Sequence, residues 1–156
     1  MANVSFRLAE EKDVALVLAF IKELAEYENL ADQVENTEEL VRKALFVDRY
    51  AEVLLAEEDE EPAGFALFFH NFSTFLGRAG IYLEDLYVRP EYRGKGYGKQ
   101  FFKELAKIAK DRNCGRIEWT CLDWNKPSIQ FYLNMSAVPM DDWTTYRLTE
   151  EVYSNL

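Results

Sequence analysis

The sequence has few of the residues from which covalent cross-links and metal sites are built. Its 156 residues include only two cysteines, Cys114 and Cys121, and a single histidine, His70. Two cysteines give no disulfide framework, and no Cys/His cluster has metal-site spacing. We therefore predict a domain that is stabilised by its hydrophobic core and needs no metal.

Long apolar runs and an excess of basic residues are also absent. No run approaches the roughly 20 residues that span a bilayer, and the start, MANVSFRLAE, lacks a basic region followed by an apolar one. Eighteen basic against 28 acidic side chains give a formal charge of −10. This balance argues against general nucleic-acid binding and favours a cationic partner. We expect a cytoplasmic protein that binds neither membranes nor nucleic acids.

The sequence is rich in the side chains that build a core. Apolar residues make up 49% of it and aromatic residues 15%, which indicates a globular chain. Its length suits one domain, and no repeat or long linker divides it. We predict a single domain over residues 1–156.

Hydrophobic periodicity predicts an α/β fold whose first part is mainly antiparallel. The predicted strands are Val4–Leu8, Ala51–Ala56, Ala63–Phe69, Ile81–Val88, Arg116–Cys121 and a closing strand, Thr145–Leu148. The predicted helices are one after Asp13, its expected N-cap, a short one capped by Thr37, then Lys99–Arg112 and Pro127–Asn134. The connection from strand 81–88 through a helix to strand 116–121 has the length of a right-handed crossover, which predicts a parallel strand pair.

A glycine-rich loop, residues 93–98, joins the strand at 81–88 to the next helix. Its sequence is Arg-Gly-Lys-Gly-Tyr-Gly. Glycines let a ligand approach the backbone closely, and the helix start offers free N–H groups to an anion. The loop lacks the Gly-Lys-Ser/Thr ending of a P-loop and reads GxGxG, so triphosphatase and dinucleotide-binding motifs fit poorly. Arg89, Arg93, Lys95 and Lys99 surround it with positive charge, as an anionic cofactor requires.

Two acidic residues, Glu84 and Asp85, interrupt the apolar strand that precedes this loop. Regular alternation would send them to opposite faces of the sheet, and an unpaired buried carboxylate is costly. Either one carboxylate is a functional group, or it is bonded to backbone amides.

A second motif, Trp124 to Tyr132, follows the last predicted core strand. It contains Asn125, Pro127 and Ser128 and ends in Phe131-Tyr132. With Arg-x-x-Gly-x-Gly at Arg93, Gly96 and Gly98, it resembles the GNAT superfamily of N-acetyltransferases. The resemblance implies the GNAT fold, a mixed sheet of about six to seven strands flanked by about four helices.

The resemblance also implies a cosubstrate, acetyl-CoA, and a role for each part of the motif. The residues that would bind acetyl-CoA are Leu86, Tyr87, Val88, Arg93, Gly94, Lys95, Gly96, Tyr97, Gly98, Lys99, Asn125 and Ser128. Glu84 would accept the proton of the attacking amine, and Tyr132 would serve the departing sulfur. Tyr132 could alternatively pack its ring on the sheet with the hydroxyl at the surface.

Most of the chain resembles the spermidine/spermine branch of that superfamily, which includes thialysine acetyltransferases. By that resemblance Tyr27, Glu28, Asp85 and Asp142 contact the cationic substrate, and the protein is a homodimer. The branch has Glu-Gly-Trp-Arg near its end, whereas this chain has Thr144-Thr145-Tyr146-Arg147. A shorter or zwitterionic amine is therefore as compatible as a polyamine. Acetylation of proteins or peptides, and a CoA-binding sensor without turnover, are the alternatives.

Overall fold

The computed structural model of the protein describes residues 2–156. Contacts divide the chain into a first unit that ends at Thr120 and a second unit, Cys121–Leu156. The first unit is built on a sheet of five strands in the order β1-β2-β3-β4-β5. The strands are β1 (Val4–Leu8), β2 (Glu52–Glu58), β3 (Glu61–Ser73), β4 (Arg78–Val88) and β5 (Ile117–Glu118).

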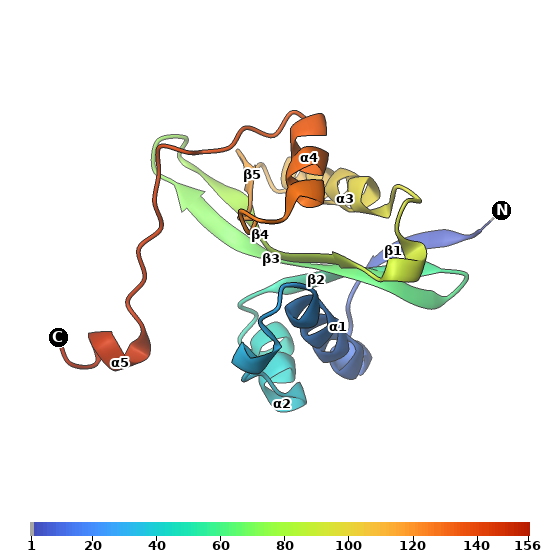
Figure 1. Cartoon of the computed structure of the whole chain (residues 1–156), viewed down its shortest axis with the longest axis horizontal. Coiled ribbons are helices and arrows are strands. Elements are labelled where there is room, and N and C mark those ends of the chain that lie inside the picture. Colours follow the sequence, from blue (N-terminus) through green and yellow to red (C-terminus); the bar gives the residue numbers. More distant parts are fainter. Residues whose placement is uncertain (1) are drawn as a thin grey trace. The chain divides into compact units, whose positions relative to one another are not determined.

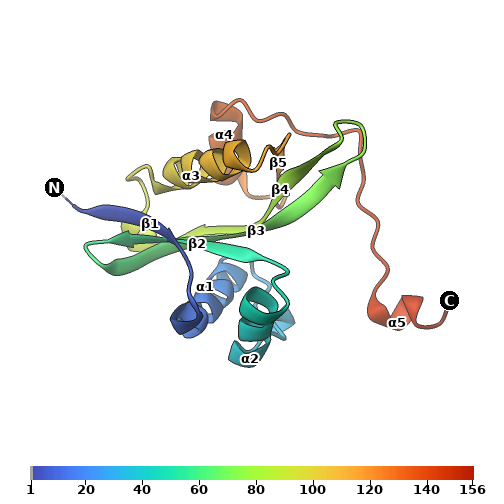
Figure 2. The same cartoon turned by 180° about the vertical axis from the view of Figure 1, so that it is seen from behind.

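The helices of the first unit cover both faces of this sheet (Figures 1 and 2). They are α1 (Val14–Tyr27), α2 (Glu38–Arg42), which continues into a π-helical turn at Lys43–Val47, and α3 (Tyr97–Asp111). Short 3-10 turns lie at Glu11–Asp13, Ala31–Gln33 and Pro90–Tyr92. In Figures 1 and 2, α1 and α2 lie on one face and α3 on the other.

Each face of the sheet has its own hydrophobic cluster. On the α1 side, Phe20 stacks on Phe65 with ring centroids 5.3 Å apart. On the α3 side, Phe101 and Leu105 pack with Ile81 of β4. Phe101 and Leu105 are four residues apart on α3, as the sequence pattern predicts for a helix buried along one stripe.

The strand pairing confirms two predictions from the sequence. β1 to β4 are joined by antiparallel pairs, including the predicted hairpin of β2 and β3, and β4 pairs with β5 in parallel. The parallel pairing is short, because it joins only Ile81 to Ile117 and Tyr82 to Glu118. Beyond Tyr82, no other strand of the described chain pairs with that edge of β4.

A β-bulge interrupts β4 at the two acidic residues. Asp85 is opposite Leu67 and Leu83 is opposite Phe68, so Glu84 is an extra residue without a partner in the ladder. A bulge resets the alternation of side chains. Asp85 therefore lies on the face of its partner Leu67, which packs against the α1 cluster. Strict alternation would put Leu83 and Asp85 on one face of the sheet, and the bulge places them on different faces.

The starts of the first two helices differ from each other. Thr37 caps α2 as predicted, because its hydroxyl accepts a hydrogen bond from the backbone N–H of Leu40. The side chain of Asp13 makes no cap bond to α1. It accepts hydrogen bonds from the Arg7 guanidinium instead, so the predicted cap is wrong.

The second unit contains two helices, α4 (Lys126–Asn134) and α5 (Glu150–Tyr153). Asn125 caps α4, with its Oδ1 3.4 Å from the amide nitrogen of Ser128. The predicted closing strand at 145–148 is wrong, because these residues make no strand pair within the described chain. The sheet accordingly has five strands where six to seven were predicted. None of the helices in residues 2–156 is long and apolar enough to cross a bilayer.

Candidate functional site

The glycine loop forms an open, donor-rich turn at the start of α3. Gly94 and Gly96 have φ values of +78° and +84°, which other L-residues adopt only with strain. Within 4 Å of an ideal Cβ at either position there is nothing. No group in residues 2–156 accepts a hydrogen bond from the backbone amides of residues 94–99, and no side chain caps α3. The loop therefore has the free amides and the space that a phosphate group requires.

Arg93 is held at the start of this loop by three contacts. Its Nε donates to the carbonyl oxygen of Val88 over 2.8 Å. The guanidinium carbon lies 5.2 Å from the ring centroid of Tyr27 and 5.5 Å from that of Tyr87. Arg93 forms no ion pair with a carboxylate of the described residues. Its charge is thus available to an anion.

Two of the four basic residues around the loop are already paired, which the sequence analysis did not predict. Arg89 binds Glu23 of α1 through Nε and Nη2, at 3.1 and 2.9 Å. Lys95 is 2.8 Å from a carboxylate oxygen of Glu58 at the end of β2. Arg93 and Lys99 are the members of this basic group that form no ion pair with any part of the described chain.

Tyr97 has a structural role as well as a place in the loop. Its side chain is buried in the α3 cluster, and its hydroxyl donates a hydrogen bond to Glu58. Burial raises the pKa of this phenol to about 12, with the carboxylate of Glu58 adding to the effect. Of Tyr97, only the backbone can therefore serve a ligand at the loop. Glu58 was missed because it lies in a charged hairpin that reads as a solvated turn.

The acidic residues at the bulge lie close to the end of α1. Burial, together with the negative charges of Glu84 and Glu28, raises the pKa of Asp85 to about 7. Burial also raises the pKa of Glu28. No hydrogen bond or ion pair with a described residue compensates Asp85. Glu84 itself is exposed. The three carboxylates therefore form an acidic group without a cation.

The end of β4 has an unpaired backbone edge, and its side chains pack within the first unit. Leu86 and Val88 pack toward the α3 cluster, whereas Tyr87 is buried in the α1 cluster and donates its hydroxyl to Glu23 over 3.2 Å. Because β5 ends opposite Tyr82, the edge of β4 from Leu83 onward lacks a strand partner in residues 2–156. This edge could bind an extended ligand through its backbone.

The remaining predicted residues belong to the second unit. Asn125 is buried and caps α4 through Ser128, and Tyr132 lies within α4 with its ring 5.6 Å from that of Phe131. Asp142 is exposed in the segment between the two helices. The cap explains why an Asn precedes Pro127. The roles of Asn125, Ser128, Tyr132 and Asp142 toward a ligand stay predictions.

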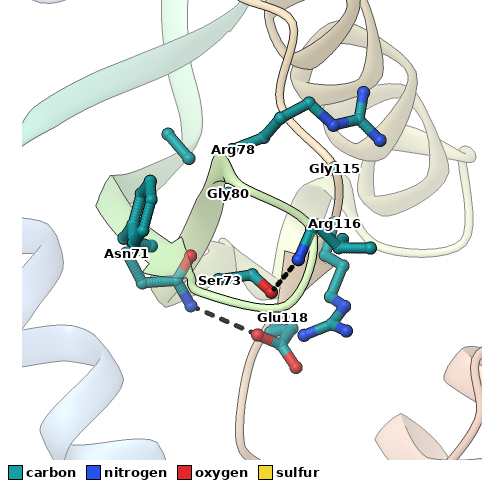
Figure 3. Close-up of a pocket in the computed structure, with 10 residues that line it drawn as sticks. Asn71, Ser73, Arg78, Gly80, Gly115, Arg116 and Glu118 are labelled. Carbon is teal, nitrogen blue, oxygen red and sulfur yellow. Dashed lines mark hydrogen bonds between the residues drawn. The ribbon is translucent and has the colours of Figure 1, made fainter.

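Two hollows of the first unit differ in what they can hold. A cavity of about 30 Å³ lies where β3 turns into β4, lined by residues that include Asn71, Arg78 and Arg116 (Figure 3). It is the size of one water molecule, and two of its lining residues, Asn71 and Glu118, are joined by a hydrogen bond of 3.2 Å. A groove of about 420 Å³ runs beside Lys95, Gly96 and Tyr97. The larger space thus adjoins the glycine loop.

The end of α1 joins the two chemical features of the first unit. Tyr27 contacts Arg93 at the glycine loop, and the negative charge of the next residue, Glu28, raises the pKa of Asp85. In residues 2–156 there is no group of three His, Cys, Asp or Glu side chains placed to hold a metal ion. The first unit thus places a loop with free backbone amides near a group of carboxylates that no cation of the described residues compensates.

Residues 18–136 match the acetyltransferase (GNAT) family. The chain therefore belongs to this family, has its α/β fold and is an acetyltransferase. Over its full length it is 38% identical to a thialysine N-epsilon-acetyltransferase of Sus scrofa, of which the alignment covers 98%. It is 31% identical to a human spermidine/spermine N(1)-acetyltransferase-like protein, with 97% of this chain and 23% of that protein covered.

Solved structures share the fold. An integron cassette protein of V. cholerae superposes with a TM-score of 0.81 at 28% identity, covering 97% of this chain and 96% of that one. A predicted acetyltransferase from Clostridium acetobutylicum, solved with acetyl-CoA, gives a TM-score of 0.77 at 21% identity, covering 93% and 96%. The second likeness concerns the fold alone.

Proposed function

We propose that the protein transfers the acetyl group of acetyl-CoA to the primary amine of a small cationic molecule, in a ternary complex. The observation that carries this proposal is the placement of two consecutive residues at the end of α1: Tyr27 contacts Arg93 of the glycine loop, and Glu28 is near enough to Asp85 to raise its pKa. Carrier and acceptor would then meet beside β4. A cytoplasmic homodimer, which the family resemblance implies, is part of the same proposal.

The residues present fit a CoA molecule. The free amides of residues 94–99 and the guanidinium of Arg93 would hold the pyrophosphate, with Lys99 nearby for a further phosphate. The unpaired edge of β4 at 86–88, together with Asn125, would hold the pantetheine arm. When bound, acetyl-CoA supplies the acetyl group as a thioester.

The carboxylates would bind and deprotonate the amine. An alkylammonium has a pKa of about 10.4 and must lose a proton before its lone pair can attack. Glu84, exposed on the bulge, would accept this proton, while Glu28, Asp85 and Asp142 hold the remaining positive charge of the substrate. The nitrogen then bonds to the acetyl carbon as the C–S bond breaks. Tyr132 would give its proton to the sulfur and regain one from the new amide nitrogen.

The relatives narrow the choice of substrate. The relatives are named for thialysine and for spermidine or spermine. These molecules share a free terminal amine on a flexible cationic chain. The loss of an acidic residue at 144–147 argues against a strict need for a long polyamine. We therefore propose thialysine, lysine-like amino acids and short diamines as the substrate class.

The test is release of free thiol from acetyl-CoA with a panel of thialysine, lysine, putrescine, spermidine, an aminosugar and a peptide. We expect turnover with the small amines and little with the peptide. Tyr132→Phe should lower turnover by about 10-fold or more. A preference for the peptide would indicate protein acetylation, and CoA binding without acetylation of any amine would indicate a sensor.

A glycine variant with a matched control tests whether the glycine loop, residues 93–98, binds CoA. Gly96→Val should abolish CoA binding, because φ of +84° is strained for Val and its side chain fills the space above the loop. Gly77→Val provides the control, since Gly77 also has positive φ but lies at the far turn between β3 and β4. Equal CoA binding by both variants would contradict the proposed role of this loop.

A further inference from the structure

The guanidinium of Arg93 lies close to two aromatic rings. It lies 5.2 Å from the Tyr27 centroid and 5.5 Å from the Tyr87 centroid, both within the range of a cation–π contact. Its Nε is bound to the carbonyl oxygen of Val88. One nitrogen is thus fixed to the backbone, and the two Nη groups retain their N–H donors for a ligand.

Both rings are anchored from α1. Tyr27 is its last residue. Tyr87 of β4 donates its hydroxyl to Glu23 of α1, and the same carboxylate binds Arg89. The Arg89 guanidinium also lies 4.7 Å from the ring centroid of Phe20, a buried residue of α1. The end of α1 is therefore fastened to the strand that leads into the glycine loop.

Aromatic rings hold an arginine without cancelling its charge. A carboxylate partner such as Glu23 of Arg89 or Glu58 of Lys95 occupies donors and opposes an incoming anion. The rings of Tyr27 and Tyr87 attract the guanidinium of Arg93 but bring no negative charge that would oppose a phosphate. Fixing this long side chain in advance also lowers the entropy lost when the ligand binds.

We propose that Tyr27 is a positioning residue for Arg93, so that it acts on CoA binding and not on the amine. This departs from the substrate contact predicted from the sequence. The inference rests on the proposed function, because it assigns the pyrophosphate of CoA to Arg93. The end of α1 would then act on both ligands, because Tyr27 positions Arg93 for CoA and Glu28 binds the cationic amine.

The experiment compares Tyr27→Leu, which loses the aromatic face, with Tyr27→Phe, which keeps it. Binding of CoA is measured by titration calorimetry, in the absence of amine. Tyr27→Leu should weaken CoA binding about 2- to 30-fold, the range of one cation–π contact, and Tyr27→Phe should bind CoA within about twofold of the wild type. In an Arg93→Met background the Leu substitution should have no further effect on CoA binding.

Two kinetic measurements separate positioning from amine contact. With S-acetylpantetheine, which lacks the pyrophosphate, Tyr27→Leu and the wild type should have the same turnover and the same KM for the amine. A raised amine KM in Tyr27→Leu with unchanged CoA binding would overturn the proposal, as would equal losses in the Leu and Phe variants. If the wild type binds CoA and Tyr27→Leu binds it equally well, this inference fails alone. If the wild type does not bind CoA, the proposed function fails with it.

Discussion

Two acidic regions of the first unit differ in whether their carboxylates have cationic partners. At the start of α1, Asp13 is buried but receives the Arg7 guanidinium at 2.7 and 2.9 Å and the amide of Glu10 at 2.7 Å. The hydrogen bonds from Arg7 lower the pKa of Asp13. At the bulge of β4, Asp85 has no such partner in the described chain, and its pKa is raised to about 7.

The difference indicates which acids serve the fold and which serve a ligand. A buried carboxylate that is fully bonded contributes to stability, whereas one left without a cation costs stability. A cationic ligand that binds beside such a carboxylate removes this loss of stability, which favours its binding. Carboxylates with pKa values raised in this way concentrate at functional sites. The acids at the bulge should therefore matter for activity, and Asp13 for folding.

The largest expected effect is on turnover, in Glu84→Gln. Loss of a general base should lower kcat by about 10²- to 10⁴-fold at neutral pH. Stability should change by less than about 0.5 kcal/mol, because the side chain is exposed and outside the ladder. Kinetics across pH and thermal unfolding measure the two effects. A fully active variant would remove Glu84 from the mechanism and leave the class of enzyme intact.

The next effect is on stability, in Asp13→Asn. The substitution leaves Arg7 with Glu57 and, more distantly at 3.9 Å, Glu10, and should cost about 2 to 3 kcal/mol of unfolding free energy at pH 7. Because the folded pKa of Asp13 is lowered, its contribution is complete above its ordinary pKa near 4 and is lost as pH falls. The deficit should thus shrink at acidic pH. Below its unfolding temperature the variant should keep the kcat of the wild type. A loss of kcat there would contradict a purely structural role for Asp13.

Asp85→Asn should raise the free energy of unfolding, whereas Asp13→Asn lowers it. The folded state binds the proton of Asp85 more tightly than the unfolded state, so the wild type loses stability as pH rises from about 4 to about 7. The neutral amide avoids this loss. Allowing for partial exposure, we expect Asp85→Asn to be about 1 to 2 kcal/mol more stable than the wild type at pH 8. Denaturant unfolding at pH 8 and pH 4 measures the difference, which should vanish at the lower pH.

Much of the fold could be predicted because it depends on local patterns. The three- and four-residue spacing of Val14, Val17 and Leu18 marks α1. Thr37 marks the start of α2. The glycines of residues 93–98 mark the loop, whose conformation needs positive φ at Gly94 and Gly96. Each of these signals lies within a few residues of the structure that it specifies.

The features that the sequence did not reveal depend on distant partners. The bulge at Glu84 is defined only by the register of β4 against β3. The pairs that occupy Arg89 and Lys95 join residues 66 and 37 positions apart. The alternation at 145–148 reads as a strand, but a strand exists only where a neighbour accepts its hydrogen bonds. Local pattern therefore placed the candidate residues, whereas pairing decided which of them stay free for a ligand.

The smallest expected change in stability comes from breaking an exposed ion pair. It tests whether ion pairing alone, without burial, explains the difference between Asp13 and Asp85. Lys107 and Glu104 are 3.1 Å apart on α3, and the Lys107 side chain is 68% exposed. In water the attraction is screened and is offset by the entropy of holding two flexible side chains. Lys107→Gln should therefore change the unfolding free energy by about 0.3 kcal/mol and leave kcat unchanged. If it destabilised the protein as much as Asp13→Asn, burial would not be what separates structural carboxylates from the rest. The same denaturant titration, run at low and high salt, decides between these outcomes, because only a solvent-exposed pair weakens markedly with salt.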